Sequence, residues 1–240
     1  FKSALTPKQC NKILEAGMSE LVKKSSAYGE AAITAQTADG KEKGGMSAAG
    51  VKTGNVKAAN MTKEKQKKLG VKESDGYVRD SSIAWLSHKW IYDLVHPFVH
   101  QANQSAGWNY EWDFSESCQF TKYQPGQFYG WHADGNSCHF GKYKRFIPGV
   151  SPTKPDGTLP RGYTEHKEMI GKVRKLSMTL NLNTPGEYEG GNLKFDFGPH
   201  SQGERFHECE EIRPQGSLIV FPSFTYHQVT PVTKGTRYSL

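Results

Sequence analysis

Two histidines and one aspartate are spaced so that they could bind a metal ion. His132 and Asp134 lie at the end of a short β-rich run, and residues i and i+2 of a strand point to the same side. A second histidine, His227, follows on another short predicted strand. Two imidazoles and one carboxylate on one face of a metal leave three positions open, an arrangement typical of Fe(II) oxygenases. Alone, the histidine–aspartate pair is a weak indication, because hydrogen-bonded pairs in protein cores have the same spacing.

Short strands dominate the part of the chain that carries these three residues. Runs of alternating or apolar residues, separated by Gly and Pro, predict eight strands. They cover residues 116–123, 127–133, 174–183, 192–197, 204–212, 217–221, 225–230 and 236–240. Helices are predicted before them, over 6–24 behind the N-cap Thr6 and through the stretch from Trp90 to Phe98. The pattern predicts an α+β fold with a double-stranded β-helix (jelly roll) core backed by N-terminal helices.

One predicted strand has an apolar face and a polar face. Over 174–183, leucines and Met178 alternate with Ser177, Thr179, Asn181 and Asn183. The apolar face suits packing on the core, and the polar face suits the lining of a cavity.

The 240 residues are expected to form one domain, 1–240, with two insertions. Residues 1–109 form a helical support that contains a Lys-, Gly- and Ala-rich insertion at about 29–76. Residues 110–240 form the jelly-roll core, with a Pro-rich insertion at about 135–173 that begins directly after Asp134. A lid or substrate-binding role and a plain surface elaboration are both open for this second insertion.

The composition indicates a polar protein without a membrane span. Hydrophobic residues make up 35% of the chain, mean hydropathy is −0.69, and no run approaches the ~18 apolar residues that a span requires. The four cysteines form no C-x-x-C pair, so reduced thiols and a cytoplasmic location are expected. They are Cys10, Cys118, Cys138 and Cys209.

The net charge of +7 comes from one segment. Between Lys41 and Lys72 nine lysines stand against two glutamates, and the rest of the chain is balanced. These lysines are not interleaved with the aromatic residues that base stacking would need. A solvated arm is therefore favoured over a nucleic-acid interface.

Four stretches in order resemble the prolyl 4-hydroxylases. Residues 123–134, YQPGQFYGWHAD, resemble that family's Y-x-x-G-x-x-Y-x-x-H-x-D segment, and 227–237 resemble its H-x-x-x-P-V-x-x-G-x-[KR] segment. Between them, 188–193 resemble the E-G-G-x-L hairpin, and upstream 82–86 are similar to the start of a family helix. The resemblance covers roughly 80–240 apart from 135–173, and four ordered motifs make it specific.

The resemblance implies a role for each residue of the site. His132, Asp134 and His227 would be the catalytic Fe(II) ligands. Arg237 would pair its planar fork with the distal carboxylate of 2-oxoglutarate, and Tyr123 would hydrogen-bond the same co-substrate. Thr179 and Asn181 are the expected additional donors. Tyr129 and Trp131 would either wall the substrate or simply pack, and Gly190 and Gly191 would serve a tight turn.

The implied activity is hydroxylation of a C–H bond, coupled to decarboxylation of 2-oxoglutarate to succinate and CO2. Fe(II), 2-oxoglutarate and O2 would be required, with ascorbate as an accessory reductant. Arg237 stands where collagen-type enzymes have Lys, closer to the bacterial and phage-encoded branch, and a bacterial or phage-infected cytoplasm is expected. A proline-containing protein or peptide is the favoured substrate. The alternatives are another residue, a small molecule, nucleic-acid demethylation, or a binding module that has lost its metal.

Overall fold

The protein is described here by a computed structural model that covers 1–28, 33–36, 42–43, 50–54, 77–134, 173–199 and 203–240. Most of the Lys-rich segment 41–72, nearly all of the insertion 135–173, and Cys138 lie outside the described residues. Cys10, Cys118 and Cys209 are free thiols, as expected. In the described part of the chain, no helix is long and apolar enough to cross a membrane.

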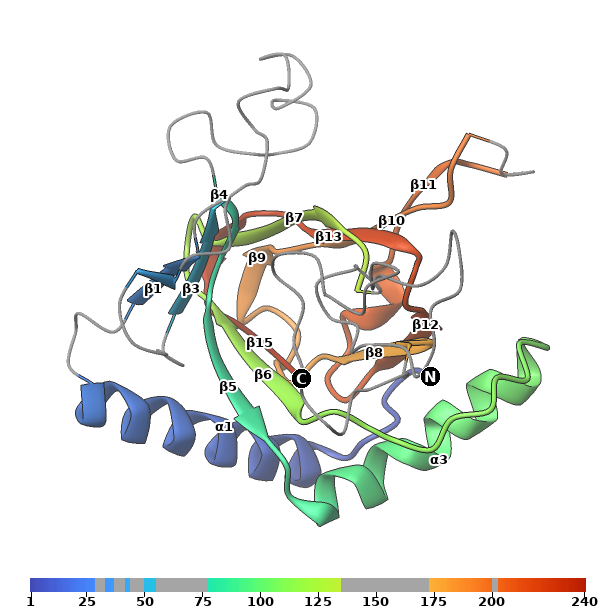
Figure 1. Cartoon of the computed structure of the whole chain (residues 1–240), viewed down its shortest axis with the longest axis horizontal. Coiled ribbons are helices and arrows are strands. Elements are labelled where there is room, and N and C mark those ends of the chain that lie inside the picture. Colours follow the sequence, from blue (N-terminus) through green and yellow to red (C-terminus); the bar gives the residue numbers. More distant parts are fainter. Residues whose placement is uncertain (29–32, 37–41, 44–49, 55–76, 135–172, 200–202) are drawn as a thin grey trace, which may run out of the picture.

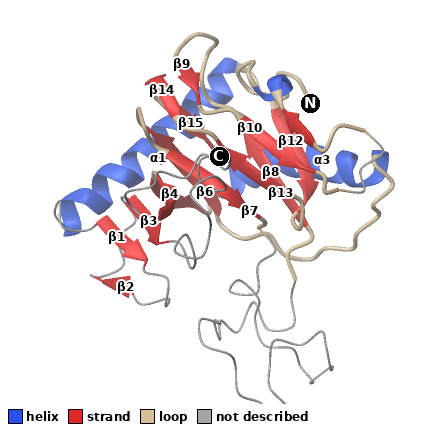
Figure 2. Cartoon of the chain, turned by 90° about the horizontal axis from the view of Figure 1, so that it is seen from above, coloured by secondary structure: helices blue, strands red, loops and turns tan. Residues whose placement is uncertain are grey.

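Two β-sheets face each other across the middle of the molecule (Figures 1 and 2). The first has eight strands. Their order is β11 (Phe206–Glu208), β10 (Leu193–Asp196), β13 (Tyr226–Val229), β7 (Phe128–His132), β4 (Tyr77–Asp80), β3 (Gly50–Gly54), β1 (Ile33–Gln36) and β2 (Glu42–Lys43). The strands nearest the candidate metal ligands, β10, β13 and β7, pair antiparallel.

The second sheet is built from two hydrogen-bonded groups that meet at Leu180 and Leu240. One group pairs β12 (Leu218–Pro222) with β8 (Leu176–Leu180), and the other contains β15 (Arg237–Ser239), β6 (Cys118–Tyr123) and β5 (Ser82–Leu86). Leu180 and Leu240 exchange two backbone hydrogen bonds, of 2.8 and 3.1 Å, which align β8 beside β15. A short pair, β9 (Tyr188–Gly190) with β14 (Val232–Gly235), closes one side. Apart from the parallel pair β1 and β3, the described strands pair antiparallel, and two such layers around a central space are consistent with the expected jelly roll.

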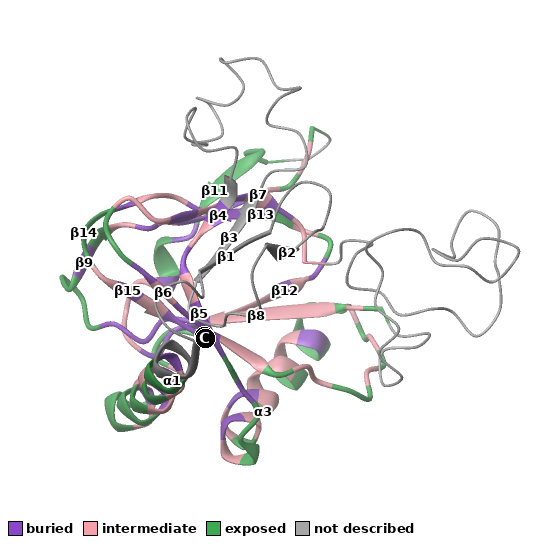
Figure 3. Cartoon of the chain, turned by 60° about the vertical axis from the view of Figure 1, so that its left-hand side comes forward, coloured by how far each residue is buried: buried purple, intermediate pink, exposed green. Residues whose placement is uncertain are grey.

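Two helices, α1 (Pro7–Tyr28) and α3 (Lys89–Ser105), cover the outer face of the second sheet (Figure 1). The start of α1 is a capping box, because Thr6 Oγ1 accepts from the Gln9 backbone N–H while Gln9 Oε1 accepts from that of Thr6. Inward residues of both helices share one core with the sheet, and the outward turns of α1 are exposed (Figure 3). The core includes Cys10, Ile13, Leu86, Ile91, Val95, Phe120, Leu180 and Leu218. This core fixes the strands that line the central space.

Four stretches differ from the sequence prediction. Residues 82–86 form strand β5 rather than the start of a helix, because they pair with β6 and bury Ile83, Ala84 and Leu86. The strand predicted over 204–212 is shorter and ends in a 3-10 helix, η5 (Glu210–Ile212). The pair β9 and β14 was not predicted, since its strands are short and contain Gly. The insertion at 29–76 contributes strands β1, β2 and β3 to the first sheet.

Candidate active site

A cavity of about 550 Å³ lies between the two sheets and extends toward α3. Both sheets contribute to its wall: β7 and β13 from the first, and β6, β8 and β15 from the second. Its size exceeds what one small dicarboxylate needs, and it falls in the usual range of ligand sites. The three candidate metal ligands and Arg237 all line this cavity.

His132, Asp134 and His227 come together at the first-sheet side of the cavity. His132 pairs directly with His227 across β7 and β13, and Asp134 follows the end of β7. Asp134 Oδ1 lies 3.4 Å from His132 Nε2, and its Oδ2 lies 3.8 Å from His227 Nε2. One ligand atom from each residue lies within 4.8 Å of the others, so the three could hold a single ion.

Both imidazole rings are oriented by the backbone. His132 Nδ1 lies 2.8 Å from the Gly130 carbonyl oxygen, and His227 Nδ1 lies 2.9 Å from that of Thr225. A carbonyl can only accept, so each Nδ1 carries a proton, and Nε2 is the nitrogen of each ring that faces Asp134. Protein ligands of metals are commonly held in this way. The donor set and its tautomers therefore fit a divalent metal.

The surroundings favour the protonation states that metal binding requires. Burial, followed by the neighbouring His132, lowers the pKa of His227 to about 4, so its imidazole is neutral at pH 7. Burial alone would raise the pKa of Asp134. The hydrogen bond with His132 and the charges of His227 and His132 outweigh burial and hold that pKa well below its usual range. Asp134 is thus a carboxylate at neutral pH.

An irregularity in β7 decides which aromatic residue faces the cavity. His132 pairs with His227 and Tyr129 pairs with Val229, so three steps along β7 match two along β13. This bulge lets Tyr129 and His132 face the same side, where their rings stack with centroids 3.5 Å apart. Trp131 points to the opposite face of the sheet, toward Phe206 and Tyr226. Of the two roles left open for these residues, Tyr129 is placed to line the cavity, whereas Trp131 packs outside it.

Arg237 reaches the same cavity from the second sheet. It pairs with Tyr123 in the register of β15 and β6, and its guanidinium carbon lies 5.4 Å from the centre of the Tyr123 ring. The side chain is 2% exposed, and its Nη1 donates to Ser239 Oγ over 3.1 Å. Its Nε is the one buried side-chain nitrogen or oxygen, among the described residues, without a hydrogen-bond partner.

That orphaned nitrogen is informative because a buried cation needs a counter-ion. Among the described residues no carboxylate forms an ion pair with Arg237. An unpaired buried charge is unfavourable by several kcal/mol in order of magnitude. The carboxylate of a small ligand would satisfy both the charge and the free N–H, so Arg237 fits a dicarboxylate co-substrate.

Because Gly191 has no side chain, there is room beside it for the side chain of Arg237. A Cβ at Gly191 would lie 3.0 Å from Arg237 Cδ and 3.0 Å from Val232 Cγ2, and the glycine has φ +57°. Gly190 has φ +70° and passes close to the Pro231 carbonyl. The turn expected here is present, and Gly191 additionally allows the close approach of Arg237.

The two residues expected as additional hydrogen-bond donors to the co-substrate, Thr179 and Asn181, occupy different environments. Thr179 lines the cavity on β8. Asn181 is fully buried outside the cavity wall, and its amide nitrogen donates to the backbone oxygens of Asn183 and Arg213. Because both amide hydrogens are used by the backbone, the expectation that Asn181 binds the co-substrate is corrected to a structural role. Tyr123 is buried on the cavity wall, as its position in the motif requires.

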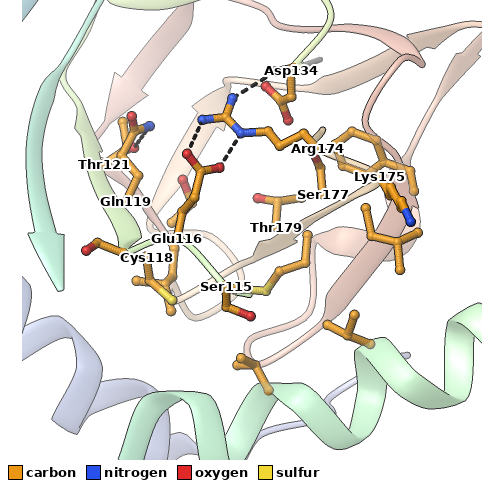
Figure 4. Close-up of a pocket in the computed structure, with 18 of the residues that line it drawn as sticks. Ser115, Glu116, Cys118, Gln119, Thr121, Asp134, Arg174, Lys175, Ser177 and Thr179 are labelled. Atoms are coloured by element: carbon orange, nitrogen blue, oxygen red, sulfur yellow. Dashed lines mark hydrogen bonds and ion pairs between the residues drawn. The ribbon is translucent and has the colours of Figure 1, made fainter. Parts of the chain in front are cut away.

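Arg174 and Glu116 form a cavity feature that the sequence did not single out (Figure 4). The Arg174 guanidinium pairs with both Glu116 carboxylate oxygens and donates to the backbone oxygen of Asp134 over 2.8 Å. It thereby links the start of β8 to the segment that carries a metal ligand. No local pattern marks Arg174, because its partners lie 58 and 40 residues away in the sequence.

A second arginine supports the aromatic ring beside the histidines. Arg79 is 5% exposed, donates to Ser81, Gln119 and Thr121, and places its guanidinium carbon 4.5 Å from the centre of the Tyr129 ring. Nothing in the local sequence distinguishes this residue, because two of its three partners, Gln119 and Thr121, come from β6, about forty residues away.

Comparisons with known proteins agree with this site. The 2OG-Fe(II) oxygenase superfamily matches residues 118–240, the segment that contains the three candidate ligands and Arg237. The chain belongs to this family. Membership implies Fe(II), 2-oxoglutarate and O2 as the requirements of the enzyme.

Individual relatives are hydroxylases. A PKHD-type hydroxylase of Xylella fastidiosa is 34% identical over 119 residues, which are 50% of this chain and 40% of that protein. A PKHD-type hydroxylase of Prochlorococcus marinus is 48% identical over 63 residues, 26% of this chain and 25% of that protein. The matched segment spans less than half the length of these relatives.

A solved structure shares the fold over the whole chain. The viral collagen prolyl hydroxylase of Paramecium Bursaria Chlorella virus-1, solved as a 2OG complex, has a TM-score of 0.52 and 15% identity. The likeness covers 100% of this chain and 90% of that chain. At this identity the similarity concerns the fold alone.

Proposed function

We propose that His132, Asp134 and His227 hold Fe(II) and that Arg237 anchors 2-oxoglutarate beside them. The observation that carries the proposal is the buried Arg237 guanidinium, whose Nε lacks a partner and which faces the same cavity as the two histidines and the carboxylate. A metal-binding triad and an unpaired cation in one cavity suit a metal with a bound 2-oxo acid. The facing sheets are inferred to be a double-stranded β-helix.

Each residue has a defined task in the hydroxylation. The iron, when bound, supplies the activation of O2 that the side chains cannot supply. The Gly130 and Thr225 carbonyls hold the two imidazoles with Nε2 toward Asp134, so the three residues would hold the ion together. Arg237 and Ser239 would orient the distal carboxylate of the co-substrate, with Tyr123 and Thr179 on the adjoining wall.

We further propose that the hydroxylated group is a proline residue of a protein or peptide. Support comes from the four motifs that resemble prolyl 4-hydroxylases and from the hydroxylase relatives. The cavity continues from the triad toward α3, where Tyr92, Trp112 and Phe114 line it. Aromatic rings at an open end suit a short apolar segment with a pyrrolidine ring. Another residue or a small molecule remains the alternative substrate, and nothing in the described residues favours nucleic acid.

The metal assignment is tested by succinate formation. In Asp134→Ala, Fe(II)-dependent conversion of 2-oxoglutarate to succinate should fall below detection, because the carboxylate is one of only three ligands. Asp93→Ala is a matched control, since Asp93 is exposed on α3 and pairs with Lys89. Undiminished succinate formation by folded Asp134→Ala would refute the ligand assignment.

The substrate is tested by mass spectrometry of proline-containing peptides incubated with enzyme, Fe(II), ascorbate and 2-oxoglutarate. A mass increase of one oxygen atom, located on proline by fragmentation, is the expected result. Oxygen on another residue, or succinate without any modified peptide, would instead support the alternative substrates.

A further inference from the structure

A second cluster of possible metal ligands lies at the edge of the first sheet, outside the cavity. It contains His207 at β11, Cys209 after it and Glu211 in η5. One ligand atom from each lies within 4.8 Å of the others, and His207 Nε2 is 3.6 Å from Glu211 Oε2. None of the three lines the central cavity.

The backbone and the core hold Cys209 in place, while the side chains of His207 and Glu211 are exposed. The Cys209 backbone N–H donates to the Leu193 carbonyl over 2.9 Å, and the side chain is 6% exposed among Leu193, Phe195, Ile212 and Phe221. The His207 ring lies beside that of Phe197, with centroids 6.4 Å apart and planes 27° apart. Ligands fixed before binding lose little conformational freedom when an ion arrives.

The Cys209 thiol lies against the Glu211 carboxylate, and the two side chains form a hydrogen bond. A divalent cation can take the place of the thiol proton, forming a bond to sulfur and releasing one proton to solvent.

We propose that His207, Cys209 and Glu211 form a second divalent-cation site, suited to Zn²⁺, that ties strand β11 to helix η5. Thiolate and imidazole donors favour Zn²⁺ over Mg²⁺ and Ca²⁺, and the open fourth position is completed by water. The site is separate from the triad, because both His207 and His227 pair with Phe195 from opposite sides. Their backbones are thus about two strand spacings, roughly 10 Å, apart.

The location explains what such an ion would do. β11 is a three-residue edge strand whose residues are all exposed, so few apolar contacts hold it to the sheet. An ion bound to His207 on the strand and to Cys209 and Glu211 beyond it would fasten this edge. The proposal goes beyond the hydroxylase function and does not depend on it.

Titration with Co²⁺ distinguishes the two sites, because the triad contains no sulfur. Full-length protein and Asp134→Ala should both develop a near-ultraviolet thiolate-to-cobalt charge-transfer band, which excess Zn²⁺ removes. Cys209→Ser should lack the band, and His207→Ala should weaken Co²⁺ binding by at least about tenfold while keeping the buried thiol. Cys118→Ser is the matched thiol control and should keep the band.

Three results would overturn the proposal. They are no charge-transfer band in the folded protein, a band that persists in Cys209→Ser, and unchanged Co²⁺ affinity in His207→Ala. Circular dichroism of each variant shows whether it is folded. If Asp134→Ala loses succinate formation but retains the charge-transfer band, the second cation site is independent of the iron site.

Discussion

Arg237 is the cavity residue whose environment most clearly requires a negatively charged group of a ligand. Its charge is buried between β15 and β6, its neighbours in the wall are a hydroxyl and an aromatic ring, and one N–H has no acceptor. A co-substrate that carries a carboxylate at its far end supplies the missing acceptor. Binding of the co-substrate and stability of the wall formed by β15 and β6 therefore both depend on the Arg237 side chain.

Replacing Arg237 should act on co-substrate binding more than on the metal. We expect Arg237→Gln to raise the KM for 2-oxoglutarate roughly 10- to 100-fold, since charge-assisted hydrogen bonds contribute about 1.5–3 kcal/mol. Initial rates of succinate formation over a range of 2-oxoglutarate concentrations measure this. Lys234→Ala, at an exposed position on β14, is the control and should keep the original KM. An unchanged KM in Arg237→Gln would remove Arg237 from this role.

Among the elements, helix α1 approaches the second sheet closely at Gly17. A Cβ at this position would lie 2.3 Å from the Phe120 ring, which is fully buried. Glycine inside a helix is usually a weakness, and Ala is usually better by about 1 kcal/mol. Here the contact with Phe120 outweighs helix propensity.

Gly17→Ala should accordingly destabilise the protein, by roughly 1–3 kcal/mol for an overpacked core. Urea denaturation followed by circular dichroism gives the free energy of unfolding. Ser19→Ala, on the exposed side of the same helix, should change it by less than about 0.5 kcal/mol. A stabilised Gly17→Ala would mean that α1 sits farther from Phe120.

Elements with a strong local pattern could be predicted, and those set by distant partners could not. Thr6, followed by Pro7, marked the start of α1, and alternation marked β6, β7, β8 and β10. Strand β5 was missed as a strand because pairing with β6, not its own sequence, holds it extended. The strand pair β9 and β14 depends on glycines at positive φ, which carry no β signal.

Within the site, the residue types were predictable from motif spacing, but their directions were not. His132, Asp134, His227 and Arg237 converge on one cavity as the sequence indicated. Strict alternation predicts one face for Thr179 and Asn181, yet β8 ends at Leu180 and the Asn181 amide turns to the backbone. Arg174 and Arg79 act through partners that are distant in sequence, so no local pattern could reveal them.

At the scale of the whole molecule, the cavity lies between two sheets that are also joined by buried apolar residues, such as Tyr123 on β6 and Val229 on β13. The first sheet contributes the triad, the second contributes Arg237, and α1 and α3 support the second sheet from behind (Figure 1). A metal with its co-substrate would bridge the two sheets. Binding to the folded state alone stabilises it by mass action.

Fe(II) and 2-oxoglutarate together should therefore raise the thermal midpoint when O2 is excluded. At concentrations near one hundred times Kd the gain is about 2.7 kcal/mol, which corresponds to roughly 5–10 °C for a domain of this size. Differential scanning fluorimetry under nitrogen measures the shift. Asp134→Ala should show little shift with Fe(II), and Asp93→Ala should shift as the original protein does. An equal shift in Asp134→Ala would place the stabilising ion elsewhere.

The bulge in β7 is linked to the three-residue spacing between the tyrosine and the histidine of the motif. Between Tyr129 and His132 the spacing is odd, which a regular strand would translate into opposite faces, and the extra residue restores a common face. Deleting Gly130 would leave the tyrosine and the histidine two residues apart, and a regular strand would then place both rings on one face without a bulge. With the three-residue spacing present, the two rings share a face only because β7 is irregular. The spacing of the motif thus encodes a backbone irregularity as well as a set of side chains.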